Sequence, residues 1–371
     1  MTSLLQRIEQ SLRLPLYKLA SLFVTSKEAS LPLDGHSMKR ILLIRDDRIG
    51  DMVVSLPLFQ FLKETFPHIQ IDVLCTQYNV SVLQENPNVS QKYLLPKSLF
   101  RRFFFFRKLR KNNYDCIVSL VLSKKSRYGS FCQIIQSNNT ITVGFVQNRF
   151  EVYSKIFSIM SSIPFEEYTM TEVLLRWFSL LFAVEYNPSY MLTPLIVPET
   201  SKQYVANFFD QQNFQNQFIA YNISASDIRR QLTDNTHIEL ITMILEAYPH
   251  YNIVLLSIPK DQNTVDLLLS QFGRRVISFP ATKNINDTIA LIERSAAVIS
   301  PNTAITHVAA SLDIPLLEIY STLAPSDWRP KHAKFRFAKT DGDQYSASFK
   351  ADEIFVEFQA LMEGQYSVHS V

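Results

Sequence analysis

Short apolar runs of strand length alternate with longer segments of helical periodicity along most of the chain. In the first half, the runs predict strands at residues 41–45, 69–75, 114–121 and 140–145. In the second half, they predict strands at residues 217–224, 251–257, 274–280, 296–300 and 314–320. Apolar runs separated by helices are typical of parallel sheets that are covered on both faces. The pattern therefore predicts an α/β protein with two Rossmann-like domains.

A stretch with three prolines, residues 185–200, lies between the two series and predicts a linker. We predict an N-terminal domain at 1–188, whose first segment, 1–38, is amphipathic. A linker at 189–198 and a C-terminal domain at 199–371 follow it. A final helical pattern at 350–362 is long enough to pack back across both domains. Ligands of open α/β sheets bind outside the carboxyl ends of the strands, so we expect the two domains to face each other across a cleft.

Charge is distributed unevenly between the two halves. The chain has 371 residues, of which 47% are hydrophobic, and this is enough for two cores. Residues 1–188 contain 23 basic and 15 acidic side chains, whereas residues 189–371 contain 14 basic and 19 acidic ones. The N-terminal half should therefore prefer an anionic partner.

Cysteine use and hydropathy narrow the class of protein. Cys75, Cys116 and Cys132 lack metal-ligand spacing, which predicts buried free thiols and no metal site. Charged residues interrupt the apolar start of the chain, and no apolar run reaches the length of a membrane span, so we expect a cytosolic protein. No Gly-x-Gly-x-x-Gly follows a predicted strand, which argues against a dinucleotide oxidoreductase.

The first candidate site is the charged loop that follows the first strand, with Asp46, Asp47, Arg48, Gly50 and Asp51. A glycine can adopt positive φ at low cost and so allows a sharp turn from strand into helix. Asp51 then falls in the first helical turn, where the helix dipole stabilises a carboxylate, and it becomes a candidate base at the mouth of the cleft. The alternative is that Asp51 only caps the helix predicted to continue to Leu62.

The second candidate site follows the strand at 296–300. Asn302 and Thr303 can cap a helix, and Thr306 and His307 follow one turn further on. The free N–H groups of such a helix point at an anion, which predicts a phosphate-binding site without a glycine-rich loop. The alternative is a capped core helix.

The third candidate site follows the strand at 217–224. Ser224 and Ser226 offer hydroxyl groups, and Arg229 and Arg230 could neutralise a diphosphate leaving group. A solvated basic turn is the alternative.

The fourth candidate site is residues 97–111, where aromatic residues alternate with basic ones, including Arg101, Arg102 and Lys108. This composition suits binding to anionic lipid headgroups, and it could also bind RNA. The chain has none of the familiar RNA-recognition signatures, so we favour a phosphate-bearing lipid or sugar acceptor over a nucleic acid. Arg48 of the first loop is a further candidate for acceptor binding.

These motifs, taken in order from about residue 40 to about residue 330, resemble the heptosyltransferase family, which moves heptose from ADP-heptose to the lipopolysaccharide inner core. The N-terminal pieces of the resemblance are "ILLIRDDRIGDMVVSLPL", "FPHIQIDVL", "NPNV", "YDCIV" and "VGF". Its C-terminal pieces are "YNISASDIRRQL", "SIPKD", "SPNTAITHVAASLDIPLLEIY" and "APSDWRP".

The resemblance implies a GT-B fold and an inverting single displacement. It assigns Asp51 as the general base, Arg229 or Arg230 as the phosphate ligand, and residues 302–307 as the nucleotide-binding segment; Asp261 is our candidate to hold the ribose. The implied donor is ADP-heptose, with no cofactor and no metal. The implied acceptor is an anionic lipid-linked oligosaccharide at the inner face of the bacterial inner membrane, which a peripheral protein would contact.

The chain departs from the family pattern at two positions of the nucleotide segment. The family's Asp-Thr-Gly is Asn302, Thr303 and Ala304 here, so one negative charge is lost at this position and the backbone can approach phosphates less closely. Two alternatives therefore stay open. One is a GT-B transferase that uses another nucleotide sugar, and the other is a catalytically silent relative that binds a glycan or a partner enzyme.

Overall fold

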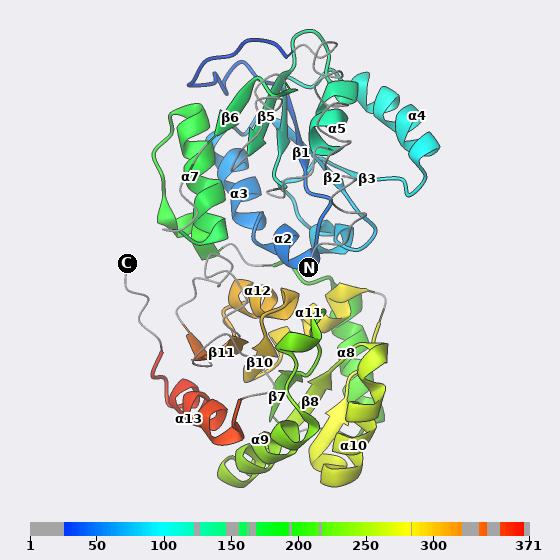
Figure 1. The fold of residues 1–371 in the computed structure, drawn as a ribbon, viewed down its shortest axis with the longest axis vertical. Coiled ribbons are helices and arrows are strands. Elements are labelled where there is room, and N and C mark those ends of the chain that lie inside the picture. The colour runs from blue at the N-terminus through cyan, green and yellow to red at the C-terminus, as the bar shows by residue number, and fades with distance from the viewer. Residues whose placement is uncertain are drawn as a thin grey trace, which may run out of the picture.

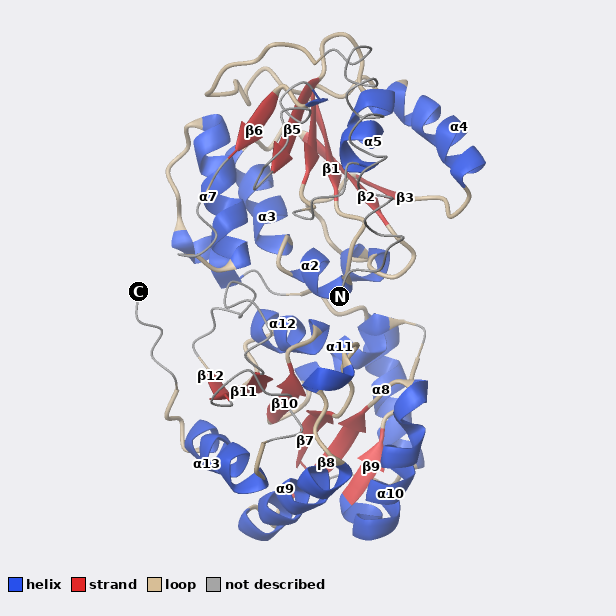
Figure 2. Cartoon of the chain, in the orientation of Figure 1, coloured by secondary structure: helices blue, strands red, loops and turns tan. Residues whose placement is uncertain are grey.

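The computed structural model describes residues 26–121, 127–145, 156–161, 163, 168–192, 195–214, 217–282, 284–320, 334–339 and 349–366. These residues form two six-stranded parallel sheets, one above the other along the long axis of the molecule (Figure 1). Helices cover both faces of each sheet (Figure 2). The prediction of an α/β protein with two Rossmann-like sheets is confirmed.

The N-terminal sheet has the strand order β3-β2-β1-β4-β5-β6. Its strands are β1 (Arg40–Ile44), β2 (Gln70–Cys75), β3 (Gln91–Leu94), β4 (Cys116–Ser119), β5 (Ile141–Phe145) and β6 (Ile159–Ser161). The helices of this half are α2 (Ile49–Val53), α3 (Leu56–Thr65), α4 (Leu99–Arg110), α5 (Arg127–Ile135) and α7 (Met170–Phe182), with short 3-10 helices η1 (Val80–Leu83) and η3 (Pro188–Leu192).

The C-terminal sheet has the strand order β12-β11-β10-β7-β8-β9. Its strands are β7 (Gln217–Asn222), β8 (Tyr251–Leu256), β9 (Val276–Ser278), β10 (Ala297–Pro301), β11 (Leu316–Tyr320) and β12 (Phe335–Lys339). The helices are α8 (Glu199–Gln211), α9 (Asp234–Ala247), α10 (Gln262–Phe272), α11 (Ile285–Glu293), α12 (Ala304–Ser311) and α13 (Ala351–Met362), with 3-10 helices η4 (Ile228–Arg230), η5 (Pro259–Asp261) and η6 (Gly273–Arg275).

Each of the nine predicted strands exists. Eight of them are central strands, which are buried on both faces and read as apolar runs, and β9 is an edge strand. Residues 41–44 of β1 and 297–299 of β10 have no exposed surface. The three cysteines are buried and unbonded, as predicted. Within the described residues, no helix is both long and apolar enough to cross a membrane.

Two predictions about helices are wrong. The helix that contains Asp51 does not continue to Leu62, because α2 ends at Val53 and a new helix, α3, starts at Leu56 with Pro57 in its first turn. Proline lacks an N–H group, so it fits the first turn of a helix but not its interior. The C-terminal helix α13 does not pack across the domains either, since it packs on α9, β11 and β12 of its own sheet.

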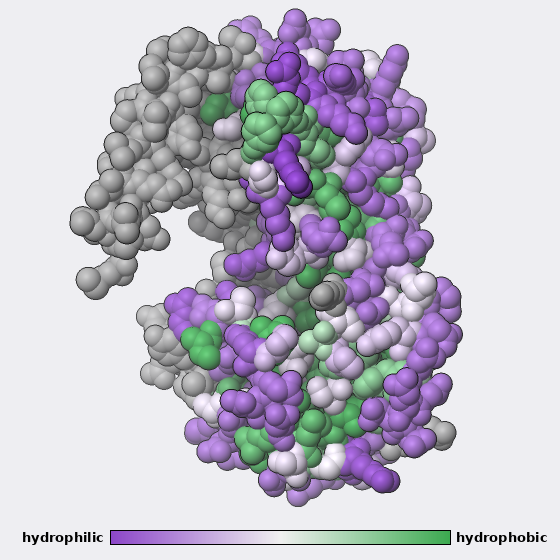
Figure 3. Space-filling model, turned by 90° about the vertical axis from the view of Figure 1, so that its right-hand side faces the viewer, coloured by the Kyte–Doolittle hydropathy of each residue, from purple (hydrophilic) through white to green (hydrophobic). Residues whose placement is uncertain are grey.

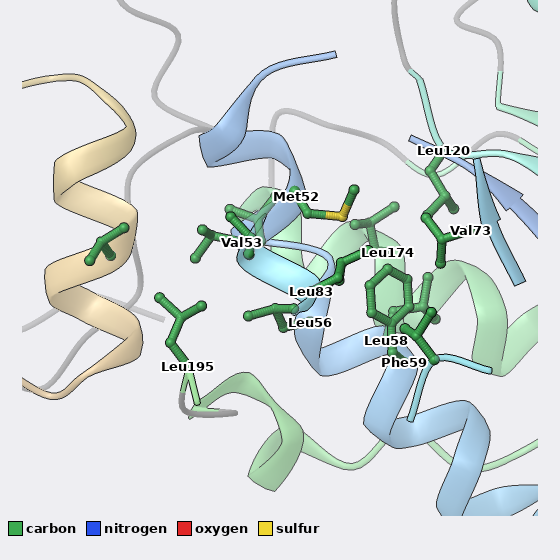
Figure 4. Close-up of a cluster of buried hydrophobic side chains, with 14 of the residues drawn as sticks. Met52, Val53, Leu56, Leu58, Phe59, Val73, Leu83, Leu120, Leu174 and Leu195 are labelled. Carbon is green, nitrogen blue, oxygen red and sulfur yellow. The ribbon is translucent and has the colours of Figure 1, made fainter. Parts of the chain in front are cut away.

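The short helix α2 is fixed by the core beneath it. Met52 and Val53 are buried in a cluster with Leu56, Leu58 and Phe59 of the next helix (Figure 4). Leu195, which follows η3 along the chain, joins the same cluster, so this residue of the connection between the two sheets is packed against the core. α2 follows β1, and α12 follows β10, and these two helices contact each other between the sheets (Figure 2).

Candidate active site

A buried arginine holds the charged loop in place. Arg45 has no exposed surface, and its Nε donates to the carbonyl of Asp51 at 2.8 Å. One terminal nitrogen, Nη1, donates to the carbonyl of Leu120 at 2.6 Å and to a carboxylate oxygen of Asp47 at 3.2 Å. The carbonyl of Arg45 accepts from the side chain of Asn79 at 2.9 Å. Arg45 therefore ties β1, β4 and α2 together at the point where the first candidate site begins.

Asp51 lies in the first turn of α2, as predicted. Its Oδ2 accepts from the backbone N–H of Arg48 at 3.0 Å, which fixes the side chain over the start of the helix. The neighbouring Asp47 behaves differently. Burial raises the pKa of Asp47 to about 6, Arg45 opposes this increase, and the charge of Asp51 adds to it. One carboxylate of this loop therefore takes up a proton far more readily than an ordinary aspartate.

The N-terminus of α12 is built from short polar side chains. Thr303 caps the helix, with its hydroxyl accepting from the N–H of Ile305 at 3.3 Å. Asn222 at the end of β7 donates to the hydroxyls of Ser300 at 2.9 Å and Thr303 at 3.2 Å, so two adjacent strand ends are joined. The hydroxyl of Thr306 is buried and donates to the carbonyl of Thr303 at 2.7 Å, so it supports the turn from inside.

α2 and α12 meet at Gly50 and His307. A Cβ at position 50 would lie 2.8 Å from Cδ2 of His307 and 3.4 Å from Cα of Ala304. Gly50 does not have the positive φ that we expected. It lies inside α2, where a Cβ would overlap the buried ring of His307, so a larger residue would fit only if that ring moved. His307, which we expected at an open phosphate site, is instead buried against Gly50.

We expect Gly50→Ala to destabilise the protein. Alanine is the better helix former by about 1 kcal/mol, but its Cβ would overlap the buried His307 ring, and overpacking costs roughly 1–3 kcal/mol. Urea unfolding of the single variant should show a net loss. The double variant Gly50→Ala/His307→Ala should recover part of that loss, and a single variant as stable as the native chain would contradict this contact.

Two buried histidines contribute to the pH dependence of stability. Burial lowers the pKa of His307 and of His237 to about 4. Between pH 6.5 and 4, the unfolded chain binds protons at both residues and the folded chain does not, so their contribution to the free energy of unfolding should fall as the pH falls. Burial raises the pKa of Asp47 to about 6 and also raises the pKa of Asp72, and these two carboxylates act in the opposite direction. The contribution of His307 is therefore measured as the difference in unfolding free energy between the native chain and His307→Gln, which urea titrations should show moving against the native chain from pH 6.5 to 4; a difference that does not change with pH would contradict this account.

In the third candidate site, the two adjacent arginines have different partners. Arg229 is 47% exposed at its side chain and forms a forked ion pair with Asp227, whose pKa is lowered to about 2 by the hydrogen bonds from Arg229. Arg230 is half-buried and turns toward α12, where its Nη1 donates to the carbonyl of Asn302 at 3.1 Å and to the side-chain oxygen of Asn302 at 3.4 Å. Its Nε is buried without a hydrogen-bond partner in the described structure. Arg230, not Arg229, therefore lies at the helix N-terminus.

The remaining residues of this site form a small network. The hydroxyl of Ser224 accepts from the N–H of Ile258 at 3.0 Å and donates to Asp261. The other oxygen of Asp261 accepts from the side chain of Gln231 at 3.2 Å. Ser226 is exposed and stands outside this network. Asp261 thus lies at the carboxyl edge of the C-terminal sheet, beside the ends of β7 and β8.

A carboxylate stands next to Asn302. The side-chain nitrogen of Asn302 donates to Oε1 of Glu318, which lies on β11 and has no exposed surface. A carboxyl group is therefore present beside position 302, on the adjacent strand, although the family's aspartate is replaced there. Neither Glu318 nor Arg45 was among the predicted site residues, although a charged residue inside an apolar strand run is rare unless it is paired and could have singled out both.

We expect Asn302→Asp to destabilise the protein by about 1–3 kcal/mol. An aspartate at 302 would replace a buried hydrogen bond by two buried carboxylates in contact. The double variant Asn302→Asp/Glu318→Gln exchanges the charge between the two positions and should restore most of the stability. Thermal unfolding of native, single and double variants tests this, and additive losses in the double variant would contradict the pairing.

The candidate acceptor residues lie in two separate places. Arg48 is exposed beside Asp51 at the edge where the sheets meet. Arg101, Arg102 and Lys108 lie on α4, at the outer edge of the N-terminal half and away from α2 (Figure 1). Arg101 and Lys108 are exposed, but Arg102 is half-buried and its Nε donates to the carbonyl of Pro96 at 2.6 Å, so it anchors the start of α4. The structure does not bring these three residues together with Asp51.

Two Rossmann-like sheets, with a candidate base on one and a candidate phosphate-binding helix N-terminus on the other, are arranged as in glycosyltransferases of the GT-B class. The model of glycosyltransferase family 9 (heptosyltransferase) matches residues 102–356, and the chain belongs to this family. The chain is 22% identical over 293 residues to lipopolysaccharide heptosyltransferase 3 of Escherichia coli, which covers 76% of this chain and 83% of the relative.

Solved structures show the same fold. The glycosyl transferase family 9 protein from Veillonella parvula superposes with a TM-score of 0.77 at 14% identity, over 90% of this chain and 99% of the other. The E. coli heptosyltransferase WaaC with ADP superposes with a TM-score of 0.68 at 14% identity, over 89% of this chain and 100% of the other. The expected GT-B fold and the expected enzyme class are confirmed.

Proposed function

We propose that this enzyme transfers a heptose from ADP-heptose to the inner core of lipopolysaccharide or lipooligosaccharide. Membership of the heptosyltransferase family supports the reaction class, and the names of the curated relatives support the acceptor. A related structure holds ADP, which supports the donor nucleotide. The single observation that carries the proposal is the packing of α2 on α12, because it brings the helix with Asp51 to the N-terminus of the helix beside Arg230.

The proposed reaction is an inverting single displacement. Asp51 accepts the proton of an acceptor hydroxyl while that oxygen forms a bond to the anomeric carbon of the donor sugar. The bond between the anomeric carbon and the terminal phosphate oxygen breaks, and ADP leaves with the electron pair. Arg230 and the free N–H groups at the start of α12 stabilise the charge that develops on the diphosphate. Asp261 is the proposed ligand of the ribose.

In this proposal, other side chains of the two sites hold Asp51 and Arg230 in position. Arg45 holds the backbone of Asp51, so that its carboxylate is presented from a rigid turn. The Asn302–Glu318 hydrogen bond orients the amide so that its oxygen lies on the side of Arg230. A guanidinium held in this way offers its remaining donors to a phosphate. Arg229, which is paired with Asp227, has no part in this proposal.

The proposed acceptor is attached to a membrane. The acceptor would be an anionic lipid-linked oligosaccharide, and the excess of basic residues in 1–188 gives the N-terminal half the complementary charge. We therefore propose a cytoplasmic enzyme attached peripherally to the inner face of the inner membrane.

The experiment is a transfer assay with purified enzyme, ADP-heptose and core oligosaccharide that lacks the terminal heptose. We expect an increase of one heptose in the acceptor mass and release of ADP in equal amount. Thermal-shift titrations with ADP, UDP and GDP test the donor separately, since a ligand that binds the folded state raises its melting temperature. A shift with UDP or GDP and none with ADP would replace the donor, and no nucleotide binding would favour a catalytically silent relative.

A further inference from the structure

The helix α4 has two apolar faces, although packing uses only one of them. Phe106 and Leu109 are buried and belong to a cluster that includes Phe131 of α5. On the other side, Phe100 is 74% exposed, Phe103 is 47% exposed and Phe104 is 56% exposed. Residues spaced by three and four lie on one face of a helix, so these three rings form a continuous patch.

The three rings are packed on one another and keep about half or more of their surface exposed. The ring centroids of Phe100 and Phe104 are 4.9 Å apart and those of Phe103 and Phe104 are 5.7 Å apart, both with edge-to-face geometry. The guanidinium of Arg107 lies 5.6 Å from the centroid of the Phe103 ring. The space-filling view from this side shows an apolar patch framed by hydrophilic side chains (Figure 3). Clustered exposed aromatics of this kind mark a surface that meets a partner.

All charged side chains of the segment that carries the patch are basic. Residues 97–111 contain seven basic and no acidic side chains. The exposed ones are Lys97, Arg101, Arg107, Lys108, Arg110 and Lys111. A second copy of this face would bring like charges together, whereas an anionic surface would be attracted. Aromatic rings framed by basic residues suit the boundary between phospholipid headgroups and acyl chains, because the rings enter the interface and the charges remain at the phosphates.

We propose that α4 docks on an anionic phospholipid bilayer, with the patch of Phe100, Phe103 and Phe104 inserted at the headgroup level. This inference deepens the proposed function, since it names the surface that brings the enzyme to a membrane-borne acceptor. It also revises the role of α4, whose basic residues would bind lipid phosphates and not the sugar that receives the heptose. α4 lies at the outer edge of its domain, so docking leaves the edge where the two sheets meet uncovered (Figure 1).

The test is flotation of the full chain with vesicles, in the absence of nucleotide and sugar. Vesicles of phosphatidylethanolamine and phosphatidylglycerol are compared with vesicles of phosphatidylcholine, for the native chain and for Phe100→Ser/Phe104→Ser. The matched control is Leu180→Ser, which removes an apolar side chain that is 61% exposed on α7 of the same half. We expect the native chain and the control to bind the anionic vesicles, and the double variant to bind them about tenfold more weakly or worse.

Two further measurements complete the test. Phe104→Trp should show a blue shift of tryptophan emission on anionic vesicles, which reports insertion even if the serine variant is poorly folded. Transfer to a lipid-free acceptor should be unchanged in Phe100→Ser/Phe104→Ser, so failure of docking and failure of the proposed transfer are distinguishable. Equal binding by native chain and double variant, or equal binding to phosphatidylcholine, would overturn the proposal. Conversion of a native dimer to a monomer by the double variant would also overturn it, because the patch would then be an interface between two copies.

Discussion

Asp51→Asn is expected to lower turnover by about 10²- to 10⁴-fold, the range in which a general base contributes to catalysis. Asparagine has the shape of aspartate and still offers an oxygen to the N–H of Arg48, so the turn that starts α2 should persist. The loss should therefore appear in kcat, with little change in the melting temperature or in the affinity for ADP. Steady-state kinetics with a saturating donor, together with thermal unfolding, measure both quantities.

The matched control is Asp47→Asn, in the same loop. Asp47 shares Arg45 with the backbone of Asp51, and its raised pKa makes it the other carboxylate that could take a proton here. If Asp51 is the base, Asp47→Asn should retain turnover within about tenfold. A larger loss in Asp47→Asn than in Asp51→Asn would transfer the role of base to Asp47 and contradict the mechanism as written.

Arg230→Ala is expected to lower turnover by about 10²- to 10³-fold, because it removes a fixed positive group from the proposed site of the leaving diphosphate. It should also weaken ADP binding, since the Nε of Arg230 is a buried donor with no partner within the described structure and a phosphate oxygen would satisfy it. Arg230→Lys should recover only part of the loss, because an ammonium cannot reproduce the fork of a guanidinium. Isothermal titration with ADP and steady-state kinetics separate binding from turnover.

Arg229→Ala serves as the control for charge alone. It removes one positive charge from the adjacent residue, but that arginine is nearly half exposed and already paired with Asp227. We expect turnover and ADP affinity to change by less than about threefold, in keeping with the small contribution of exposed ion pairs. Equal losses of turnover and ADP affinity in the two arginine variants would show that the loss comes from removing a positive charge, and not from the position of Arg230 beside Asn302.

The sequence allowed the prediction of the architecture because central parallel strands are buried on both faces. The strands that were missed lie at the edges of the sheets. β3, with the sequence QKYL, is exposed or only half-buried at every position. β6 has only three residues, and β12, with the sequence FRFAK, mixes apolar and basic residues. Edge strands pair on one side only, so their sequence carries little hydrophobic signal.

Within the site, local chemistry was predictable and contacts between distant residues were not. Thr303 caps α12 and Asp51 lies in the first turn of α2, as the sequence indicated, because both depend on the chain within four residues. The lack of space for a side chain at position 50 arises from His307, more than 250 residues away along the chain, and no local turn required glycine there. The Trp-Pro turn of "APSDWRP", which the resemblance included, lies outside the described residues.

The choice between Arg229 and Arg230, and the position of the carboxyl group near Asn302, likewise depended on tertiary contacts. Two adjacent arginines cannot be distinguished by sequence, but in the fold one pairs with Asp227 and the other reaches Asn302. Glu318 is separated from Asn302 by sixteen residues and meets it because β10 and β11 are adjacent parallel strands. Adjacent strands of a sheet bring such residues together irrespective of their distance along the chain.

The central claim is that this enzyme adds a heptose to the inner core and that Asp51 is its base. The most direct measurement is mass spectrometry of lipopolysaccharide from the source organism with and without the gene, complemented by the native chain or by Asp51→Asn. We predict that deletion removes the mass of one heptose, that the native chain restores it, and that Asp51→Asn does not. An unchanged core after deletion, or full restoration by Asp51→Asn, would contradict the claim.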